Sequence, residues 1–331
     1  MQGVSAKIKS MEESIRNFAK QFSYIPEIIN AHAFKNHGRF IIVGMGGSHL
    51  SADILKMARP EIPIYIHKDY GLPGFNTREL EKQTIILSSY SGNTEEVADS
   101  LTCALEKKLA VLIIAAGGTL LGRAKKYSLP YIQLPQTDIQ PRMALGYSLR
   151  ALLKAFGDEE TLKKTEGLVE TLHPDIFENG GKILAKKIQE KVPIIYSSGG
   201  NVAVALNWKI KFNETAKIPA FYNIFPELNH NEMTGFDTRE STRKLSEHFY
   251  FILLKDAGDH PQILKRMSVL EKLLKERGRP VEVLELAGDT IFKKIFTSLL
   301  LADWTAYYSA RHYGIEPEQV PMVEEFKKLI K

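Results

Sequence analysis

The stretch IIVGMGGSHLSADIL (residues 41–55) decides the fold, and its pattern returns in IIYSSGGNVAVALN (residues 194–207). Each stretch is an apolar, β-branched run followed by a glycine turn and a helical pattern, which is typical of a strand–turn–helix unit. The two stretches begin about half a chain length apart, and 331 residues exceed the usual size of one domain. We therefore expect two similar α/β domains that arose by internal duplication, covering residues 1–155 and 156–331.

Further alternation of strands and helices follows both stretches. Short, nearly continuous apolar runs predict strands at residues 40–43, 62–66, 84–88, 110–115, 131–134, 193–197, 220–224, 248–254 and 281–286. Helical spacing predicts helices at residues 10–34 and 95–107 and a helical connector at residues 146–190. Strands of this kind are covered on both faces, so we expect a mainly parallel sheet flanked by helices in each domain.

The composition is that of an ordinary globular protein and excludes several classes of function. A net charge of +5 is small for this length, and the basic residues are spread along the chain, so we expect no nucleic-acid partner. No apolar run approaches the roughly 18 residues of a membrane span, and the first residues carry no signal-peptide core. The single cysteine, Cys103, allows no intramolecular disulfide, so we expect a cytoplasmic protein that does not bind membranes.

The glycine turn of the first stretch is a candidate phosphate-binding loop. Gly46, Gly47 and Ser48 follow the strand and open a helix, where a tight turn directs backbone N–H groups toward a ligand. A dinucleotide-binding loop is the competing interpretation, but it needs a third glycine where this chain has His49. Asp69 lies about 20 residues further on, so spacing alone leaves the nicotinamide alternative open.

The loop SSYSGNT (residues 88–94) is the stronger candidate for phosphate binding. It places the hydroxyls of Ser89, Ser91 and Thr94 between the end of a strand and the start of a helix. Three hydroxyls and the freed backbone amides suit a dianion, helped by the helix dipole, whereas a helix cap needs only one hydroxyl. The second half has no counterpart of this loop, so we expect one phosphate site in the chain.

These motifs together resemble a known family. GMGGS followed by SSYSGNT resembles the sugar isomerase (SIS) family of phosphosugar-binding domains. NETAKIPAFYNIFPELNHNEMTGF (residues 213–236) resembles the signature of the bifunctional phosphoglucose/phosphomannose isomerases, and matching features recur at residues 141–146 and 303–331. The resemblance implies two SIS-type domains. It also implies an aldose–ketose isomerase that acts on hexose 6-phosphates through a cis-enediolate, without a cofactor.

The resemblance further implies which residues do the chemistry. Glu214 occupies the position of the family's base, which moves a proton between C1 and C2 of the sugar. His230 matches the histidine that helps to open the sugar ring and is contributed across a dimer interface, which implies a homodimer. Arg142 matches a residue that stabilises the anionic oxygens of the enediolate. Lys327 matches a lysine that takes part in ring opening, and Lys328 is the alternative next to it.

One turn departs from the family's pattern. The family often has a threonine shortly before the last helix, and this threonine is associated with accepting the mannose as well as the glucose configuration. Here the position holds Glu318, or Gln319 if the register shifts by one. The resemblance therefore implies interconversion of glucose 6-phosphate with fructose 6-phosphate first, and mannose 6-phosphate second.

Two alternatives to this function stay open. A related phosphosugar isomerase would act on an amino-sugar or pentose phosphate, and a non-catalytic sensor would bind a sugar phosphate without turnover. A sensor has no use for Glu214, His230 and Lys327 together. His32 and His37 are close enough to share a metal, but no cysteine or further histidine nearby completes a set, so we expect no metal site.

Overall fold

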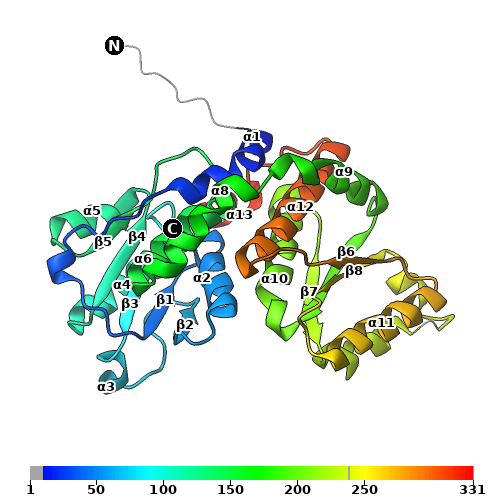
Figure 1. Ribbon diagram of the computed structural model, residues 1–331, viewed down its shortest axis with the longest axis horizontal. Coiled ribbons are helices and arrows are strands. Elements are labelled where there is room, and N and C mark those ends of the chain that lie inside the picture. Colours follow the sequence, from blue (N-terminus) through cyan, green and yellow to red (C-terminus); the bar gives the residue numbers. More distant parts are fainter. Residues whose placement is uncertain (1–9, 238, 331) are drawn as a thin grey trace, which may run out of the picture. The chain divides into compact units, whose positions relative to one another are not determined.

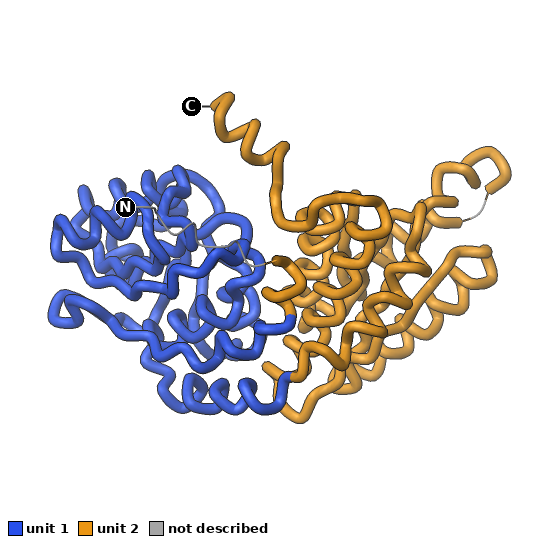
Figure 2. The backbone as a smooth tube through the Cα atoms, turned by 90° about the horizontal axis from the view of Figure 1, so that it is seen from above, with its two compact units in different colours: residues 1–9, 16–172 blue, residues 10–15, 173–331 orange. Residues whose placement is uncertain are grey.

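The computed structural model describes residues 10–237 and 239–330, and the chain divides into two compact units (Figure 1 and Figure 2). Unit 1 comprises Arg16–Leu172, and unit 2 comprises Ser10–Ile15 together with the residues from His173 onward. The division falls within the predicted helical connector. The domain boundary that we expect after residue 155 lies in the same connector and stays a prediction.

Unit 1 is built on a five-stranded parallel sheet. Its strands, in the order β2-β1-β3-β4-β5, are β1 Phe40–Val43, β2 Ile64–His67, β3 Thr84–Ser88, β4 Val111–Ala115 and β5 Tyr131–Gln133. Phe40 is the register partner of both Ile64 and Thr84, so β1 lies between β2 and β3. Every residue of β1, β3 and β4 is buried, as continuous apolar runs predict for strands covered on both faces.

Helices cover both faces of this sheet. The helices of unit 1 are α2 Gly47–Ala58, α3 Thr77–Leu80, α4 Glu95–Glu106, α5 Gly118–Lys126, α6 Leu145–Phe156, α7 Glu159–Glu166 and α8 Leu168–Thr171. Ile41 of β1 shares a core cluster with Leu101 of α4 and Leu120 of α5. Side chains alternate between the faces of a strand, so the preceding residue, Phe40, points to the other face. There its ring centroid lies 4.3 Å from that of Phe156 in α6.

Unit 2 has a four-stranded parallel sheet with the strand order of the first four strands of unit 1. Its strands, in the order β7-β6-β8-β9, are β6 Val192–Ser198, β7 Phe221–Phe225, β8 Phe249–Lys255 and β9 Val281–Glu285. Its helices are α1 Met11–Arg16, α9 Glu178–Lys187, α10 Val202–Lys211, α11 Pro261–Glu276, α12 Ile291–His312 and α13 Pro321–Leu329. The repeated strand order confirms the prediction of two similar, mainly parallel α/β units.

The prediction of one helix over residues 10–34 is wrong. That segment forms α1 and two 3-10 turns, Phe18–Ser23 and Ala31–Ala33. Pro26 lacks the N–H that a continued helix needs and disfavours helical backbone in the residue before it. Asn30 takes the left-handed conformation, with φ of 58°, and interrupts the segment a second time.

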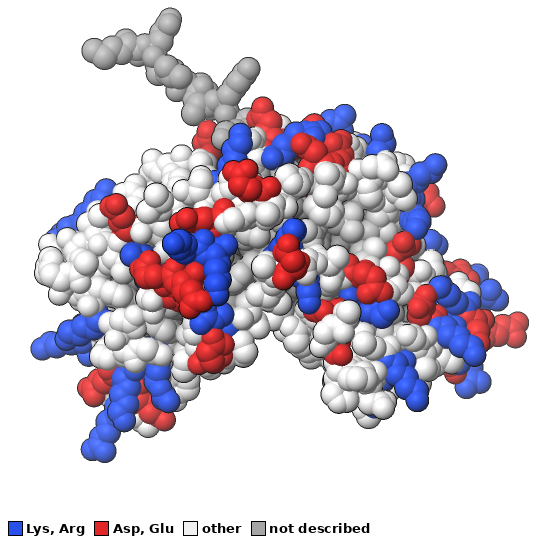
Figure 3. All heavy atoms as spheres, in the orientation of Figure 1, with Lys and Arg blue, Asp and Glu red and all other residues white. Residues whose placement is uncertain are grey.

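Charges of both signs are spread over the molecular surface. On the face that Figure 3 shows, lysines and arginines are interspersed with aspartates and glutamates. The net charge of +5 is therefore not gathered into one patch on that face. Within residues 10–237 and 239–330, no helix has both the length and the hydropathy that crossing a membrane requires.

The packing of α9 on α12 predicts which glycine of α9 can be replaced. A Cβ on Gly181 would clash with Trp304 and lie 2.9 Å from the backbone N of Thr305, whereas a Cβ on Gly180 would meet the flexible end of Leu301. Gly181→Ala should therefore lower the free energy of unfolding by about 1–3 kcal/mol. The control Gly180→Ala should raise it by up to about 1 kcal/mol or leave it unchanged, since alanine favours a helix. Urea unfolding checks both, and equal stability of the two variants would contradict the packing.

Candidate active site

Two loops of unit 1 meet at the carboxyl edge of its sheet, because they follow the neighbouring strands β1 and β3. The Oγ of Ser88 donates a hydrogen bond to the carbonyl oxygen of Ser48 at 3.0 Å. The N–H of Tyr90 donates to the Oγ of Ser48, also at 3.0 Å. Ser48 is buried, Gly47 is half-buried and Gly46 is exposed. The structure thus joins the two loops that the sequence proposes for phosphate binding.

The predicted hydroxyls of the second loop lie at the start of α4. Ser89 is wholly buried; its Oγ lies 2.7 Å from the Oγ1 of Thr94 and accepts from the N–H of Gly92 at 3.1 Å. Thr94 is the N-cap residue of α4, yet its side chain makes no capping hydrogen bond. Its hydroxyl pairs with Ser89 instead, so a simple helix cap does not account for this threonine. Ser91 is exposed.

A third loop, which the sequence reasoning missed, holds SSYSGNT in place. Thr119 donates to the Oδ1 of Asn93 from its N–H at 2.9 Å and from its Oγ1 at 3.0 Å. A Cβ on Gly92 would clash with the carbonyl group of Gly117, and a Cβ on Gly118 would clash with the facing loop. Gly92 and Gly118 also have φ of 70° and 71°, which favours glycine. The sequence signal that could have revealed this loop is the glycine pair Gly117–Gly118, which follows β4 after one intervening residue.

Arg142 lies beside the glycine turn in unit 1. It belongs to the 3-10 turn Pro141–Met143 and is 1% exposed. A Cβ on Gly47 would lie 2.6 Å from the carbonyl carbon of Pro141 and 2.7 Å from the backbone N of Arg142. The turn therefore packs directly on the start of α2. A buried guanidinium keeps its charge and is suited to pairing with anionic oxygens.

Glu214 lies in unit 2 on a π-helical turn, Phe212–Ala216, that continues α10. Such turns are rare and recur at functional sites. Lys211, directly before this turn, forms a buried ion pair with Asp303 of α12. Each side chain is 3% exposed, and Nζ lies 2.5 Å from Oδ1. This pair fixes the end of α10 to α12, so the half-buried Glu214 follows an anchored segment.

The turn before α13 is tied to the turn that carries Glu214. Lys217 ends the π-helical turn in the left-handed conformation, and its Nζ donates to the carbonyl oxygen of Glu316 at 2.6 Å. The carboxylate of Glu316 accepts from the backbone N–H groups of Glu318 at 2.8 Å and Gln319 at 2.7 Å. A single lysine thus links the turn that carries Glu214 to the turn that carries Glu318 and Gln319, the two candidates for the position of the family's threonine.

The other two predicted residues of unit 2, His230 and Lys327, are exposed. His230 follows the 3-10 turn Glu227–Asn229 at the end of β7. Lys327 lies on α13, where its Nζ is 2.9 Å from the Oε1 of Glu324. Both side chains are accessible to a substrate or to another subunit.

The corresponding edge of unit 2 carries two carboxylates beside the buried hydroxyl of Ser198, whose Oγ accepts from the Nδ2 of Asn201 at 3.1 Å. There Asn201 donates to Asp256 and Asp259, and Lys294 binds both oxygens of Asp256 at 2.7 and 2.9 Å. Burial alone would raise the pKa of Asp256, but Lys294 and the Gly258 amide hold it below its ordinary value. Burial raises the pKa of Asp259, and the charge of Asp256 adds to the rise. Negative charge at this edge disfavours a phosphate there, and the single phosphate site expected from the sequence stays a prediction.

Known proteins resemble this chain along most of its length. Residues 177–330 match the family model described as the bacterial phospho-glucose isomerase C-terminal SIS domain. A bifunctional phosphoglucose/phosphomannose isomerase of Caldicellulosiruptor bescii is 32% identical over an alignment covering 96% of this chain and 98% of that protein. The chain belongs to the bifunctional phosphoglucose/phosphomannose isomerase family. A relative of the same name from Aquifex aeolicus is 31% identical over 88% of this chain and 90% of its own length.

Membership of this isomerase family confirms the resemblance drawn from the motifs, and with it the prediction of an isomerase rather than a dinucleotide-binding enzyme. Tagatose-6-phosphate ketose/aldose isomerase from Escherichia coli has a similar structure, with a TM-score of 0.67 over 97% of this chain and 98% of that chain. At 16% identity this likeness shows the fold alone. Which residues of the isomerase bind and react stays a prediction.

The pairing of Thr94 with Ser89 predicts which substitution weakens phosphate binding. Thr94→Val removes the hydroxyl and should raise the KM of the isomerase for its sugar phosphate about tenfold or more, because a hydrogen bond to a charged group is lost. Thr94→Ser keeps the hydroxyl and should stay within about threefold of the wild-type KM. A Thr94→Val enzyme with the wild-type KM would contradict phosphate binding by this hydroxyl.

Asn76→Ala is the matched control, because the side chain of Asn76 does cap a helix and accepts from the N–H of Glu79 at 3.0 Å. It should lower the free energy of unfolding by about 1 kcal/mol and leave the KM unchanged.

Proposed function

We propose that this isomerase interconverts glucose 6-phosphate with fructose 6-phosphate, and mannose 6-phosphate with fructose 6-phosphate. The observation that carries the proposal is the similarity to relatives named bifunctional phosphoglucose/phosphomannose isomerase, which runs through both halves of the chain. Glucose and mannose 6-phosphate differ only at C2, and that difference disappears in the enediolate. One intermediate therefore serves both aldoses, and the movement of protons within the sugar, from C2 to C1 and from O2 to O1, requires no cofactor.

Unit 1 holds the phosphate of the hexose. The proposed contacts are backbone amides and hydroxyls of the two joined loops, from Gly46, Gly47, Ser48, Ser89, Ser91 and Thr94. Such groups at a helix start favour a dianion through their N–H donors and the helix dipole. The burial of Ser48 and Ser89 and their hydrogen bonds support the proposal, because they hold the hydroxyls in place before substrate binds.

Glu214 moves the proton in this proposal. Its carboxylate takes the proton from C2 of the aldose, which leaves a cis-enediolate. The hydroxyl proton then passes from O2 to O1, and the carboxylate returns its proton to C1 to give the ketose. Before that step, His230 and Lys327 (or its neighbour Lys328) open the ring by transferring a proton from the C1 hydroxyl to the ring oxygen. Arg142 stabilises the anionic enediolate oxygens with its fixed charge.

The exposure of His230 supports a homodimer in which each histidine completes the site of the other subunit. An imidazole outside the core of its own unit is available to a second copy. The positions of Glu318 and Gln319, on the turn linked to Glu214 through Lys217, support a role for this turn in choosing between the two aldoses.

Substitution of Glu214 tests the reaction itself. Glu214→Gln cannot accept the proton, and its kcat should fall about 10²- to 10⁴-fold on all three sugar phosphates, with little change in KM. Glu276→Gln, which changes an exposed glutamate at the end of α11, should match the wild type. A coupled assay on the three substrates measures this.

Two results would contradict the proposed reaction: wild-type activity in Glu214→Gln, or no activity of the wild type on any of the three. Turnover of only an amino-sugar or pentose phosphate would favour a related isomerase. Tight binding without turnover would favour the sensor.

Mixing two inactive variants tests the exchange of His230. A dimer of one Glu214→Gln subunit and one His230→Asn subunit contains one complete site if the histidine comes from the other subunit, and none if it comes from the same subunit. Equal mixing after subunit exchange should therefore restore about a quarter of wild-type activity, since about half of the dimers are mixed. No recovery in dimers shown by mass spectrometry to be mixed would contradict the exchange.

A further inference from the structure

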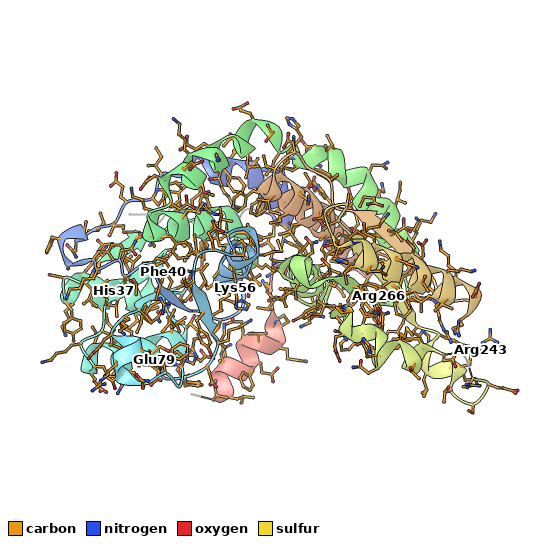
Figure 4. All side chains as sticks on the ribbon, turned by 60° about the horizontal axis from the view of Figure 1, so that its bottom comes forward. His37, Phe40, Lys56, Glu79, Arg243 and Arg266 are labelled. Atoms are coloured by element: carbon orange, nitrogen blue, oxygen red, sulfur yellow. The ribbon has the colours of Figure 1, made fainter. Side chains whose placement is uncertain are left out.

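The loop that carries His230 is held against unit 2 on both sides of the histidine. Leu228, two residues before it, is wholly buried, and Met233 packs against the same core cluster. Arg266 of α11 (Figure 4) donates to the Oδ1 of Asn229 at 3.3 Å, next to the histidine. His230 itself stays exposed between these contacts.

Glu232 adds a polar attachment two residues after His230. Its Oε1 accepts from the Oη of Tyr196 at 2.5 Å, and its Oε2 accepts from the Nδ2 of Asn223 at 2.5 Å. Tyr196 on β6 and Asn223 on β7 are register partners, so their side chains leave the sheet on the same face and reach one carboxylate. The N–H of Ile224 donates to the Oδ1 of Asn223 at 2.8 Å, which turns the amino group of the amide toward Glu232.

This attachment is directional, whereas the apolar contacts are not. Tyr196 is 1% exposed, and burial together with the Glu232 carboxylate raises the pKa of Tyr196, so its hydroxyl stays a hydrogen-bond donor at every working pH. Hydrogen bonds to a charged carboxylate are short and about twice as strong as neutral ones. Two of them on one carboxylate fix both the position and the rotation of the chain at Glu232, while Leu228 fixes the chain before the histidine.

We propose that Glu232, held by Tyr196 and Asn223, is a positioning residue that sets the place of the His230 imidazole. Glu232 does not touch the sugar. The proposal rests on the ring-opening role proposed for His230 and adds the group that fixes the histidine before substrate arrives. Proton transfer is sensitive to misplacement of about 1 Å, so loss of the attachment lowers kcat and leaves phosphate binding in unit 1 intact.

Exchanging the two polar partners tests the geometry. Glu232→Gln places two amide groups face to face, and Asn223→Asp places two carboxylates face to face, so each should lower kcat about 10- to 100-fold with KM within about threefold. The double variant Asn223→Asp/Glu232→Gln restores a donor opposite an acceptor and should recover kcat to within about threefold of the wild type. A double variant no better than the single ones overturns the proposal.

The matched control is a second tyrosine–glutamate pair on the same sheet. Glu282 accepts from the Oη of Tyr250 at 3.2 Å and from the Nζ of Lys187 at 2.7 Å, and it lies on β9, at the edge opposite β7. Glu282→Gln should leave kcat and KM unchanged. A loss equal to that of Glu232→Gln would mean a general effect on folding and would overturn the proposal.

A double-mutant cycle shows whether Glu232 acts through the histidine. In a His230→Asn background, Glu232→Gln should change the residual kcat by less than about twofold, because there is no imidazole left to misplace. If the two losses multiply, Glu232 does not act through His230 and the proposal is overturned. Wild-type activity in His230→Asn would instead overturn the proposed role of the histidine. If Glu232→Gln fails to fold, Tyr196→Phe, which removes one hydrogen bond, replaces it in the cycle.

Discussion

At the carboxyl edge of the unit 1 sheet, backbone approaches backbone so closely that only glycine fits at the points of contact. The start of α2 touches the turn of Arg142 at Gly47, and the serine loop touches the next loop at Gly92 and Gly118. These contacts bring the GMGGS turn, the hydroxyls of SSYSGNT and the buried arginine onto one edge. A side chain at any of them would separate the loops and remove the place in which an anion can be held. The part of the candidate site that lies in unit 1 depends on these contacts.

Unit 2 has different side chains at the corresponding edge of its sheet. The loop after β8 places Asp256 and Asp259 at the edge where unit 1 has its serine loop, and Lys294 neutralises Asp256. A carboxylate of unit 2 thus lies at the edge that corresponds to the proposed phosphate site of unit 1, and unit 2 carries the proposed catalytic residues Glu214 and His230. The two units keep one topology, and in the proposed reaction unit 1 anchors the substrate while unit 2 provides proton transfer.

Continuous apolar runs made the strands of both sheets predictable, because strands covered on both faces leave a strong local signal. The prediction of one helix over residues 10–34 failed because Pro26 and the left-handed Asn30 interrupt it. Distant contacts also hold its turns: Gln21 donates to the carbonyl of Met143 at 2.7 Å and accepts from Gly146 at 3.0 Å. The loop of Gly117 and Gly118 could have been noticed from its glycine pair. The bond from Tyr196 to Glu232 could not, because it exists only through the register of β6 and β7. Family resemblance, rather than local pattern, singled out Glu214 and His230.

In the proposed reaction, a carbon-bound hydrogen moves as a proton through a carboxylate of the enzyme. Incubating fructose 6-phosphate with the wild-type enzyme in D2O and following the aldoses by ¹H NMR tests it most directly. A carboxylate that holds the proton can exchange it with solvent, so deuterium should appear at C2 of glucose 6-phosphate and mannose 6-phosphate. Formation of aldoses with no deuterium at C2, or of no aldose at all, would contradict the account.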